Sequence, residues 1–134
     1  MSPKVLYAER NQLCIHLMKG CLEKAGWDVT GVLSTDEALE AIQRDTPDIV
    51  ITGVVLLASS GYELCRAIRN ADDLVTKRLP LIVLSWHERP EDIGQGFRAG
   101  ADAYLAKPCD LDEVKAVMDG LLKKKLKATK TGRQ

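Results

Sequence analysis

The sequence predicts an α/β fold in which a doubly wound, five-stranded parallel sheet is covered by helices on both faces. Short apolar segments and helical patterns alternate five times along the 134 residues, as in repeated strand-helix units. Residues 81–84 are apolar throughout and residues 49–51 are β-branched, as expected of strands that are buried on both faces. Right-handed crossovers then place helices on both sides of the sheet.

The first two strand-helix units follow from local signals. Residues 5–8 form a short apolar segment and are the expected first strand. Residues 27–33 predict the second strand, and Ser34 with Glu37 forms a capping-box pattern that begins the second helix. Between the strands, apolar residues recur at helical spacing before Gly26, and we expect them to face the core: Cys14, Leu17, Met18, Cys21, Leu22 and Ala25.

The other three units are equally regular. Residues 49–52 predict the third strand, residues 62–70 a helix, and a polar loop then leads to Pro80. Residues 81–84 predict the fourth strand. The fourth helix begins near Pro90 and contains Gly94 and Gly96, which should soften it. The fifth strand is expected over 103–106, and Asp110 with Glu113 begins the last helix. One domain is expected over residues 1–122, followed by a flexible basic tail over 123–134.

Composition excludes several classes of function. Nineteen basic and nineteen acidic residues cancel, so no overall charge attracts the chain to nucleic acid or to a membrane surface. We find no signal peptide and no apolar segment long enough to span a bilayer, and therefore expect a cytoplasmic protein. With four cysteines, two histidines and no CxxC pair, a zinc site is not expected.

The residues that follow the strands form the candidate site. The first strand is followed by Glu9 and Arg10, and the third ends at Gly53. In doubly wound sheets, ligands bind at the carboxyl ends of the strands, beside the point where the strand order reverses. Ser85 and Trp86 follow the fourth strand, and Lys107 follows the fifth.

At these positions the chain resembles the receiver domain of two-component response regulators, over about residues 4 to 122. The segments that carry the resemblance are PDIVITG, SGYELCRAIR, PLIVLS and, above all, GADAYLAKP. It implies the strand order 2-1-3-4-5. It also implies a phosphoryl group accepted by an aspartate at the end of the third strand, beside a magnesium ion held partly by two acidic residues.

The resemblance is incomplete where the chemistry takes place. Glu9 matches the first acidic residue, but Arg10 stands in place of the second and Gly53 in place of the phosphoacceptor. No Asp or Glu lies between Thr52 and Tyr62, so a shifted register supplies no acceptor. We therefore expect no catalytic residue and no bound metal or other cofactor.

Other family positions are kept or altered one by one. Ser85 matches the hydroxyl that binds the phosphoryl group, Lys107 the lysine, and Tyr104 the aromatic switch residue. Trp86 stands where the family has a small residue, and we expect it to crowd the pocket. Lys107, which lacks its usual carboxylate partner, is expected to pair with Glu9.

These observations favour a pseudo-receiver: a signalling module, not an enzyme, that acts by protein–protein contact without aspartate phosphorylation. The alternatives are a small-anion-responsive protein, with Arg10, Lys107 and Ser85 around Gly53, and a conventional phosphorylated receiver. Expected partners are signalling proteins such as a histidine kinase or an output protein. Self-association through the fourth helix, fifth strand and last helix is a further expectation, with Tyr104 held either inward or outward. No membrane or nucleic-acid partner is expected.

Overall fold

A five-stranded parallel sheet forms the centre of the protein in a computed structural model, which describes residues 2–86, 89–107 and 110–132. The strand order is β2-β1-β3-β6-β7, which confirms the predicted fold class and the order 2-1-3-4-5 of the five main strands. The two edge strands each pair with one neighbour, whereas β1, β3 and β6 pair on both sides. The strands are β1 (Lys4–Ala8), β2 (Asp28–Val32), β3 (Ile49–Thr52), β6 (Leu81–Ser85) and β7 (Ala103–Ala106).

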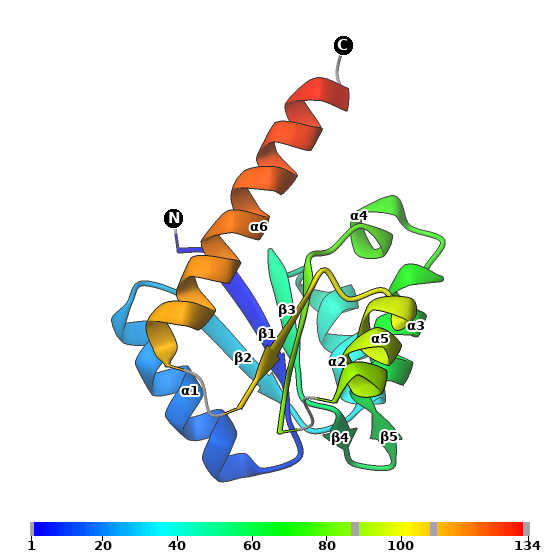
Figure 1. The fold of residues 1–134 in the computed structure, drawn as a ribbon. Coiled ribbons are helices and arrows are strands. Elements are labelled where there is room, and N and C mark those ends of the chain that lie inside the picture. Colours follow the sequence, from blue (N-terminus) through cyan, green and yellow to red (C-terminus); the bar gives the residue numbers. More distant parts are fainter. Residues whose placement is uncertain (1, 87–88, 108–109, 133–134) are drawn as a thin grey trace.

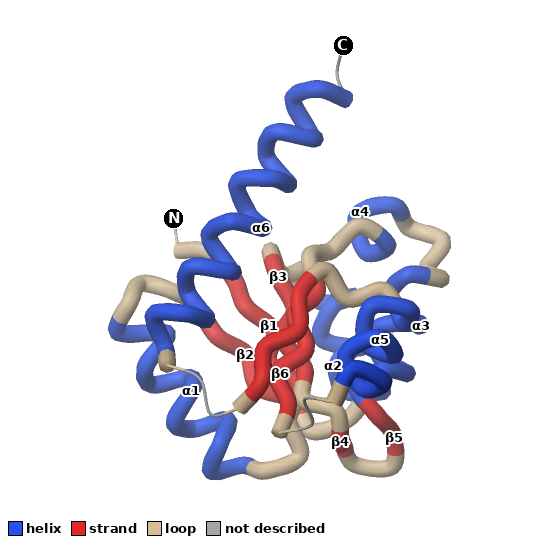
Figure 2. The backbone as a smooth tube through the Cα atoms, in the orientation of Figure 1, coloured by secondary structure: helices blue, strands red, loops and turns tan. Residues whose placement is uncertain are grey.

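Helices cover both faces of the sheet (Figures 1 and 2). On one face lie α1 (Gln12–Lys24) and α6 (Leu111–Gly132), and on the other lie α2 (Thr35–Arg44), α3 (Gly61–Arg69) and α5 (Pro90–Ala99). Two hydrophobic cores result, one on each side. Successive side chains of a strand point to opposite faces, so Val5 and Tyr7 of β1 belong to one core while Leu6 and Ala8 belong to the other.

The inward face of α1 differs from the prediction. Leu22 is fully buried, and Ile15 and Met18 pack against the same core. By contrast, Leu17 is 59% exposed and Cys21 lies on the surface. The prediction was also wrong for Ala25, which is exposed, and Cys14 is only half-buried.

Gly31 of β2 explains why α1 faces this way. A Cβ atom built at Gly31 would overlap the Ile15 side chain, so the missing side chain creates the space into which Ile15 packs. Apolar residues occupy both sides of α1, so helical spacing alone did not show which side faces the core. The contact between Ile15 and Gly31 turns one side inward and leaves Leu13 and Leu17 outside.

Helix ends follow the predicted signals with small changes. The Ser34 hydroxyl accepts a hydrogen bond from the Glu37 N–H at 3.1 Å, and the Glu37 carboxylate accepts one from the Leu33 N–H at 2.7 Å. The reciprocal bond of the capping box is therefore made one residue earlier than usual. The segment expected to be a loop before Pro80 contains a short helix, α4 (Leu74–Lys77), because Asp73 caps its first turn.

A hairpin that the sequence did not predict joins β3 to α3. It consists of β4 (Val55–Leu56) and β5 (Ser59–Ser60), which pair antiparallel. Its two ends meet, since the Gly61 N–H donates to the Val54 carbonyl at 2.7 Å. A Cβ atom at Gly61 would collide with the backbone carbonyl of Gly53, so the chain crosses itself at a point where only glycine fits.

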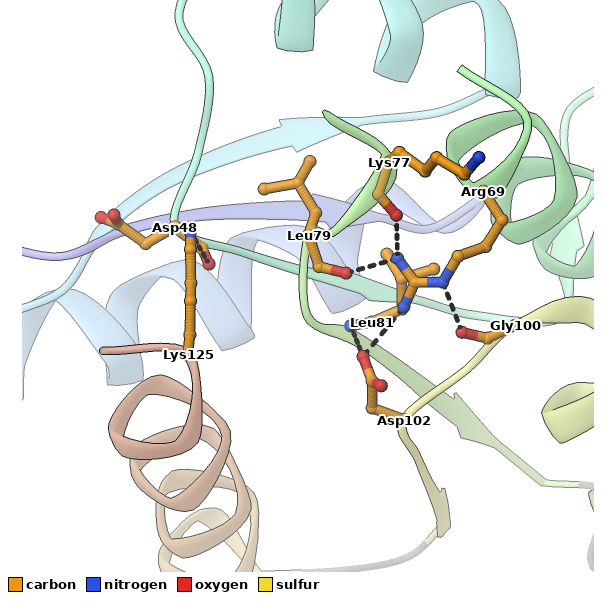
Figure 3. A network of polar contacts seen from close by, with 8 residues as sticks. All are labelled: Asp48, Arg69, Lys77, Leu79, Leu81, Gly100, Asp102 and Lys125. Carbon is orange, nitrogen blue, oxygen red and sulfur yellow. Dashed lines mark hydrogen bonds and ion pairs between the residues drawn. The ribbon is translucent and has the colours of Figure 1, made fainter. Parts of the chain in front are cut away.

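The amino ends of the strands are connected by an extensive polar network (Figure 3). Arg69, at the end of α3, forms an ion pair with Asp102 at 2.9 Å. The Asp102 carboxylate also accepts a hydrogen bond from the Leu81 N–H at 2.9 Å, so it joins the starts of β6 and β7. The other donors of the Arg69 guanidinium bind three backbone carbonyls, those of Gly100, Lys77 and Leu79, at 3.0, 2.8 and 2.7 Å.

The last helix extends beyond the sheet (Figure 1). Lys125 reaches back from α6 to the Asp48 carbonyl, at a distance of 3.5 Å (Figure 3). The helical backbone continues to Gly132 and includes most of the segment expected as a tail, in which lysine, alanine and leucine favour helix. Flexibility of residues 123–134 stays a prediction. No helix in the described part of the chain is long and apolar enough to cross a membrane.

Candidate functional site: the pocket at the carboxyl ends of the strands

The six predicted pocket residues lie around one cavity of about 250 Å³. It opens at the carboxyl ends of β1, β3, β6 and β7, where the parallel sheet brings together residues far apart in the sequence. The cavity is lined by side chains or backbone of Glu9, Arg10, Gly53, Ser85, Trp86 and Lys107, among others. Their functional roles stay predictions.

A single ion pair joins the two charged residues deepest in this cavity. The Lys107 Nζ lies 3.1 Å from the Glu9 Oε1, which confirms the expected pairing. The Lys107 and Glu9 side chains are only 15% and 11% exposed, so water screens the pair less than it would at an open surface. The other Glu9 oxygen accepts a hydrogen bond from the Asn11 N–H at 3.0 Å. Glu9 is thereby held by two partners.

Gly53 has no side chain at the position that the family resemblance assigns to the phosphoacceptor, and the Glu9 carboxylate lies close to that position. A Cβ atom built there would lie 3.3 Å from the Glu9 Oε1 and 3.9 Å from the Ala8 carbonyl. The backbone of Gly53 is itself anchored, because its N–H donates to the Ala8 carbonyl at 2.9 Å. The Glu9 carboxylate is therefore the acidic group nearest to this position.

Trp86 stands at the rim of the cavity. Its ring centroid is 5.9 Å from the Lys107 Nζ, within the range of a cation–π contact. The residue stays 67% exposed, so the ring borders the approach to Lys107 on one side without closing the cavity. Ser85, in contrast, is buried, and Arg10 is exposed.

The side chains at this site do not fit the magnesium ion that the family implies. Magnesium prefers several oxygen ligands, with one or two carboxylates among them. Among the described residues that line the cavity, Glu9 alone carries a carboxylate, and the Lys107 ammonium forms an ion pair with it. Among the residues that the structure describes, no group of three or more His, Cys, Asp and Glu side chains could hold a metal ion.

Tyr104 lies inward, against α5. Its half-buried ring packs beside the core formed with α2 and α3. A Cβ atom at Gly96 would be 2.8 Å from this ring, so the ring occupies the space that a side chain at position 96 would need. Tyr62 of α3 is the other neighbour, and burial followed by its hydrogen bond with Tyr104 raises the Tyr62 pKa well above its usual range.

Sequence reasoning did not identify Gly96 and Tyr62 as partners of Tyr104. Gly96 was interpreted only as a softening residue, and Tyr62 only as the start of a helix. The contact depends on how α3, α5 and β7 meet in space, and no local pattern reports such a meeting. A glycine inside a helix, which costs about 1 kcal/mol relative to alanine, was the one available signal.

Comparison with known proteins places the chain in a family. The family model described as the response regulator receiver domain matches residues 5–119. The phosphate regulon transcriptional regulatory protein PhoB of Rhizobium meliloti is 33% identical over 124 residues, which are 92% of this chain and 54% of that protein. The response regulator MprA of Mycobacterium ulcerans is 32% identical over the same share of this chain and 52% of its own. The chain thus spans about half the length of these curated relatives.

Solved structures agree with the sequence matches. A putative response regulator from Chloroflexus aurantiacus superposes with a TM-score of 0.85 at 30% identity, covering 92% of this chain and 99% of that one. The chemotaxis response regulator CheY4 of Vibrio cholerae has a TM-score of 0.82 at 24% identity, covering 90% and 99%, and supports the fold. With the family model matching most of the chain, this protein belongs to the response regulator receiver domain family.

Proposed function

We propose that this chain is a receiver-like signalling module that acts by protein–protein contact, without phosphorylation of an aspartate. The observation that carries the proposal is Gly53 at the end of β3, in the position where the family resemblance puts the phosphoacceptor. Residues 53–61 contain no Asp or Glu, so the adjoining loop supplies no substitute. A receiver without this carboxylate keeps the fold and lacks the nucleophile.

The charges that remain in the pocket support the same proposal. In phosphoryl transfer, a positive group must be available to neutralise charge that develops on the phosphoryl oxygens. The Lys107 ammonium is already paired with Glu9 at 3.1 Å and has the Trp86 ring beside it. The pocket therefore contains an ion pair whose charges cancel, in place of an acidic cluster that binds magnesium. Neither phosphorylation nor metal binding is needed to neutralise these two side chains.

Proposed partners are other signalling proteins, such as a histidine kinase or an output protein, and a cytoplasmic setting is part of the proposal. The relatives PhoB and MprA bear the names of a transcriptional regulatory protein and a response regulator. For the contact face we propose α5, β7 and α6, where Phe97 is 48% exposed. We also propose that two copies of the chain can associate through this face. A membrane or nucleic-acid partner is not part of the proposal.

Intact-mass measurement after incubation with magnesium and acetyl phosphate tests the proposal. The mass should not increase by a phosphoryl group, whereas a receiver that retains its aspartate, treated in parallel, should be modified. A stoichiometric adduct that maps to an aspartate or glutamate of this chain would establish the alternative of a conventional phosphorylated receiver.

A small-anion-responsive module is the second candidate. The favourable observation is that Arg10, Ser85 and Lys107 line one cavity around a residue without a side chain. Arginine and lysine are suited to phosphate or sulfate, but Glu9 compensates one of the two positive charges. Millimolar phosphate should raise the melting temperature if this candidate is right, and Arg10→Ala should remove the shift. An unchanged melting curve at matched ionic strength leaves only the protein-binding module.

A further inference from the structure

The contact of Tyr104 with Gly96 is closer than an ordinary side-chain contact. Tyr104 sits in β7 opposite Val83 of β6, so its backbone position is fixed by the sheet. A Cβ atom at Gly96 would lie 2.8 Å from the ring Cδ2 and 3.1 Å from the Cε2 of Tyr104. Cβ atoms in proteins essentially never approach other atoms below 3.0 Å. The inward position of the ring is therefore compatible with glycine at position 96 and not with a larger residue.

Tyr62 holds the ring from the other side. It is 6% exposed, and its hydroxyl donates to the Asp92 carbonyl of α5 at 3.3 Å. Its ring Cε1 is 3.6 Å from the Cβ position of Gly96, so both tyrosine rings meet at the same glycine. Residues from α3, α5 and β7 thus form one contact.

A comparison of Gly94 with Gly96 shows that the contact at Gly96 is more than a general loss of helix stability caused by glycine. Each costs about 1 kcal/mol relative to alanine in a helix interior. A Cβ atom at Gly94 would meet only the far end of the flexible Arg98 side chain, at 3.1 Å, which can move aside. At Gly96 the neighbouring ring belongs to a strand residue and is packed against a second ring, so it cannot move without leaving the core.

We propose that Gly96 and Tyr62 clamp the Tyr104 ring inward and so hold the face of α5 and β7 in one conformation, whatever the state of the pocket. This inference rests on the proposed function and concerns how the contact face of the module is regulated. A partner that recognises this face meets the same surface at all times, and signalling depends on the amount of the protein or its partner. Release of the clamp, by contrast, would change the surface directly.

The test uses the full chain labelled with fluorotyrosine. The chain has three tyrosines, and Tyr7 is 1% exposed in the sheet and serves as an internal reference. The wild-type protein should give one Tyr104 signal without exchange broadening, unaffected by magnesium and acetyl phosphate. In Gly96→Ala the Tyr104 signal should shift and become more accessible to a soluble paramagnetic probe. In the matched control Gly94→Ala it should stay in place, although the same methyl group is added to the same helix.

Three outcomes would overturn the clamp. They are two exchanging Tyr104 signals in the wild type, a Gly96→Ala spectrum that matches that of Gly94→Ala, or no change of the Tyr104 signal in Tyr62→Ala. If Gly96→Ala fails to fold, Tyr62→Phe provides the second variant, since it removes only the hydroxyl and should shift Tyr104 by a smaller amount. Failure of the proposed function is seen separately, as a phosphoryl adduct by intact mass, and does not depend on the position of the ring.

Discussion

The charged side chains at the two ends of the sheet have different kinds of partners. At the amino ends of β6 and β7, the Arg69 guanidinium binds three backbone carbonyls and the Asp102 carboxylate (Figure 3). At the carboxyl ends, the Lys107 ammonium has one carboxylate, that of Glu9, and the Trp86 ring. The first network joins separate elements of the fold. The second compensates charges within one cavity.

The difference shows that the contacts joining the strands at their amino ends are separate from the residues that line the cavity at their carboxyl ends. Arginine presents several donors in a planar arrangement, so Arg69 can satisfy several carbonyls that would otherwise lack partners. None of these contacts involves the cavity that Gly53 lines. The contacts of Arg69 should therefore stabilise the fold independently of the residues that line the cavity.

The largest expected effect is the loss of Arg69. In Arg69→Met the carbonyls of Gly100, Lys77 and Leu79 lose a donor and Asp102 loses its ion pair, so the free energy of unfolding should fall by about 2–4 kcal/mol. Urea unfolding measures it. Arg66→Met, an exposed position one turn earlier on α3, should change it by less than about 0.5 kcal/mol. Equal losses in the two variants would show that the network does not stabilise the fold.

Alkaline pH should lower the stability of the fold. Burial raises the pKa of the Cys65 thiol, one turn before Arg69, from 9.0 to about 11. The folded state then holds the Cys65 proton more tightly than the unfolded state. The contribution of this proton to the free energy of unfolding is therefore complete below pH 9 and is lost as the pH rises toward 11. Cys65→Ala should flatten the decline of stability between these values by up to about 1.4 kcal/mol per pH unit. An identical slope in the variant would show that this thiol does not titrate in that range.

The ion pair at the carboxyl end should contribute less. A double-mutant cycle with Glu9→Gln and Lys107→Met should give a coupling free energy of about 1 kcal/mol, because the side chains are shielded but not fully buried. The coupling should decrease when salt is added. A coupling near zero at low salt would mean that the pair sets geometry alone, and one as large as the Arg69 effect would remove the contrast between the two ends.

The smallest expected effect is that of magnesium. Millimolar magnesium should leave the melting temperature of the wild-type protein unchanged relative to a salt control of equal ionic strength, because Glu9 carries the one carboxylate among the described residues that line the cavity. Gly53→Asp adds a second carboxylate beside Glu9, and magnesium should then raise the melting temperature. A magnesium-specific shift in the wild type that disappears in Glu9→Gln would contradict the expectation.

Much of the fold could be predicted because the relevant information is local. Residues 49–51 of β3 are apolar because both faces of the strand are covered. Ser34 marks a helix start by its own hydrogen bond. Glu9 and Lys107 could be paired in advance because parallel strands bring their carboxyl ends to one edge of the sheet.

What could not be predicted depends on contacts between elements. The inward face of α1 is decided by Ile15 packing onto Gly31, a residue of another strand. The position of Tyr104 depends on Gly96 in the same way. In both cases a missing side chain on one element receives a side chain from another, and single-sequence patterns identify the glycine without identifying what fills its space.

The crossing of the chain at Gly53 and Gly61 has a practical consequence. The hairpin between them starts and finishes at the same point, where the Gly61 N–H meets the Val54 carbonyl. The hairpin is not part of the five-stranded sheet, although its Leu57 N–H donates to the Leu33 carbonyl after β2 at 2.9 Å. Each doubling of a loop whose ends are already joined costs only about 0.6 kcal/mol in entropy. Peptides inserted after Ala58, at the exposed tip, would be displayed beside the cavity while the strand order is preserved. The hairpin makes this receiver fold a candidate scaffold for presenting foreign sequences.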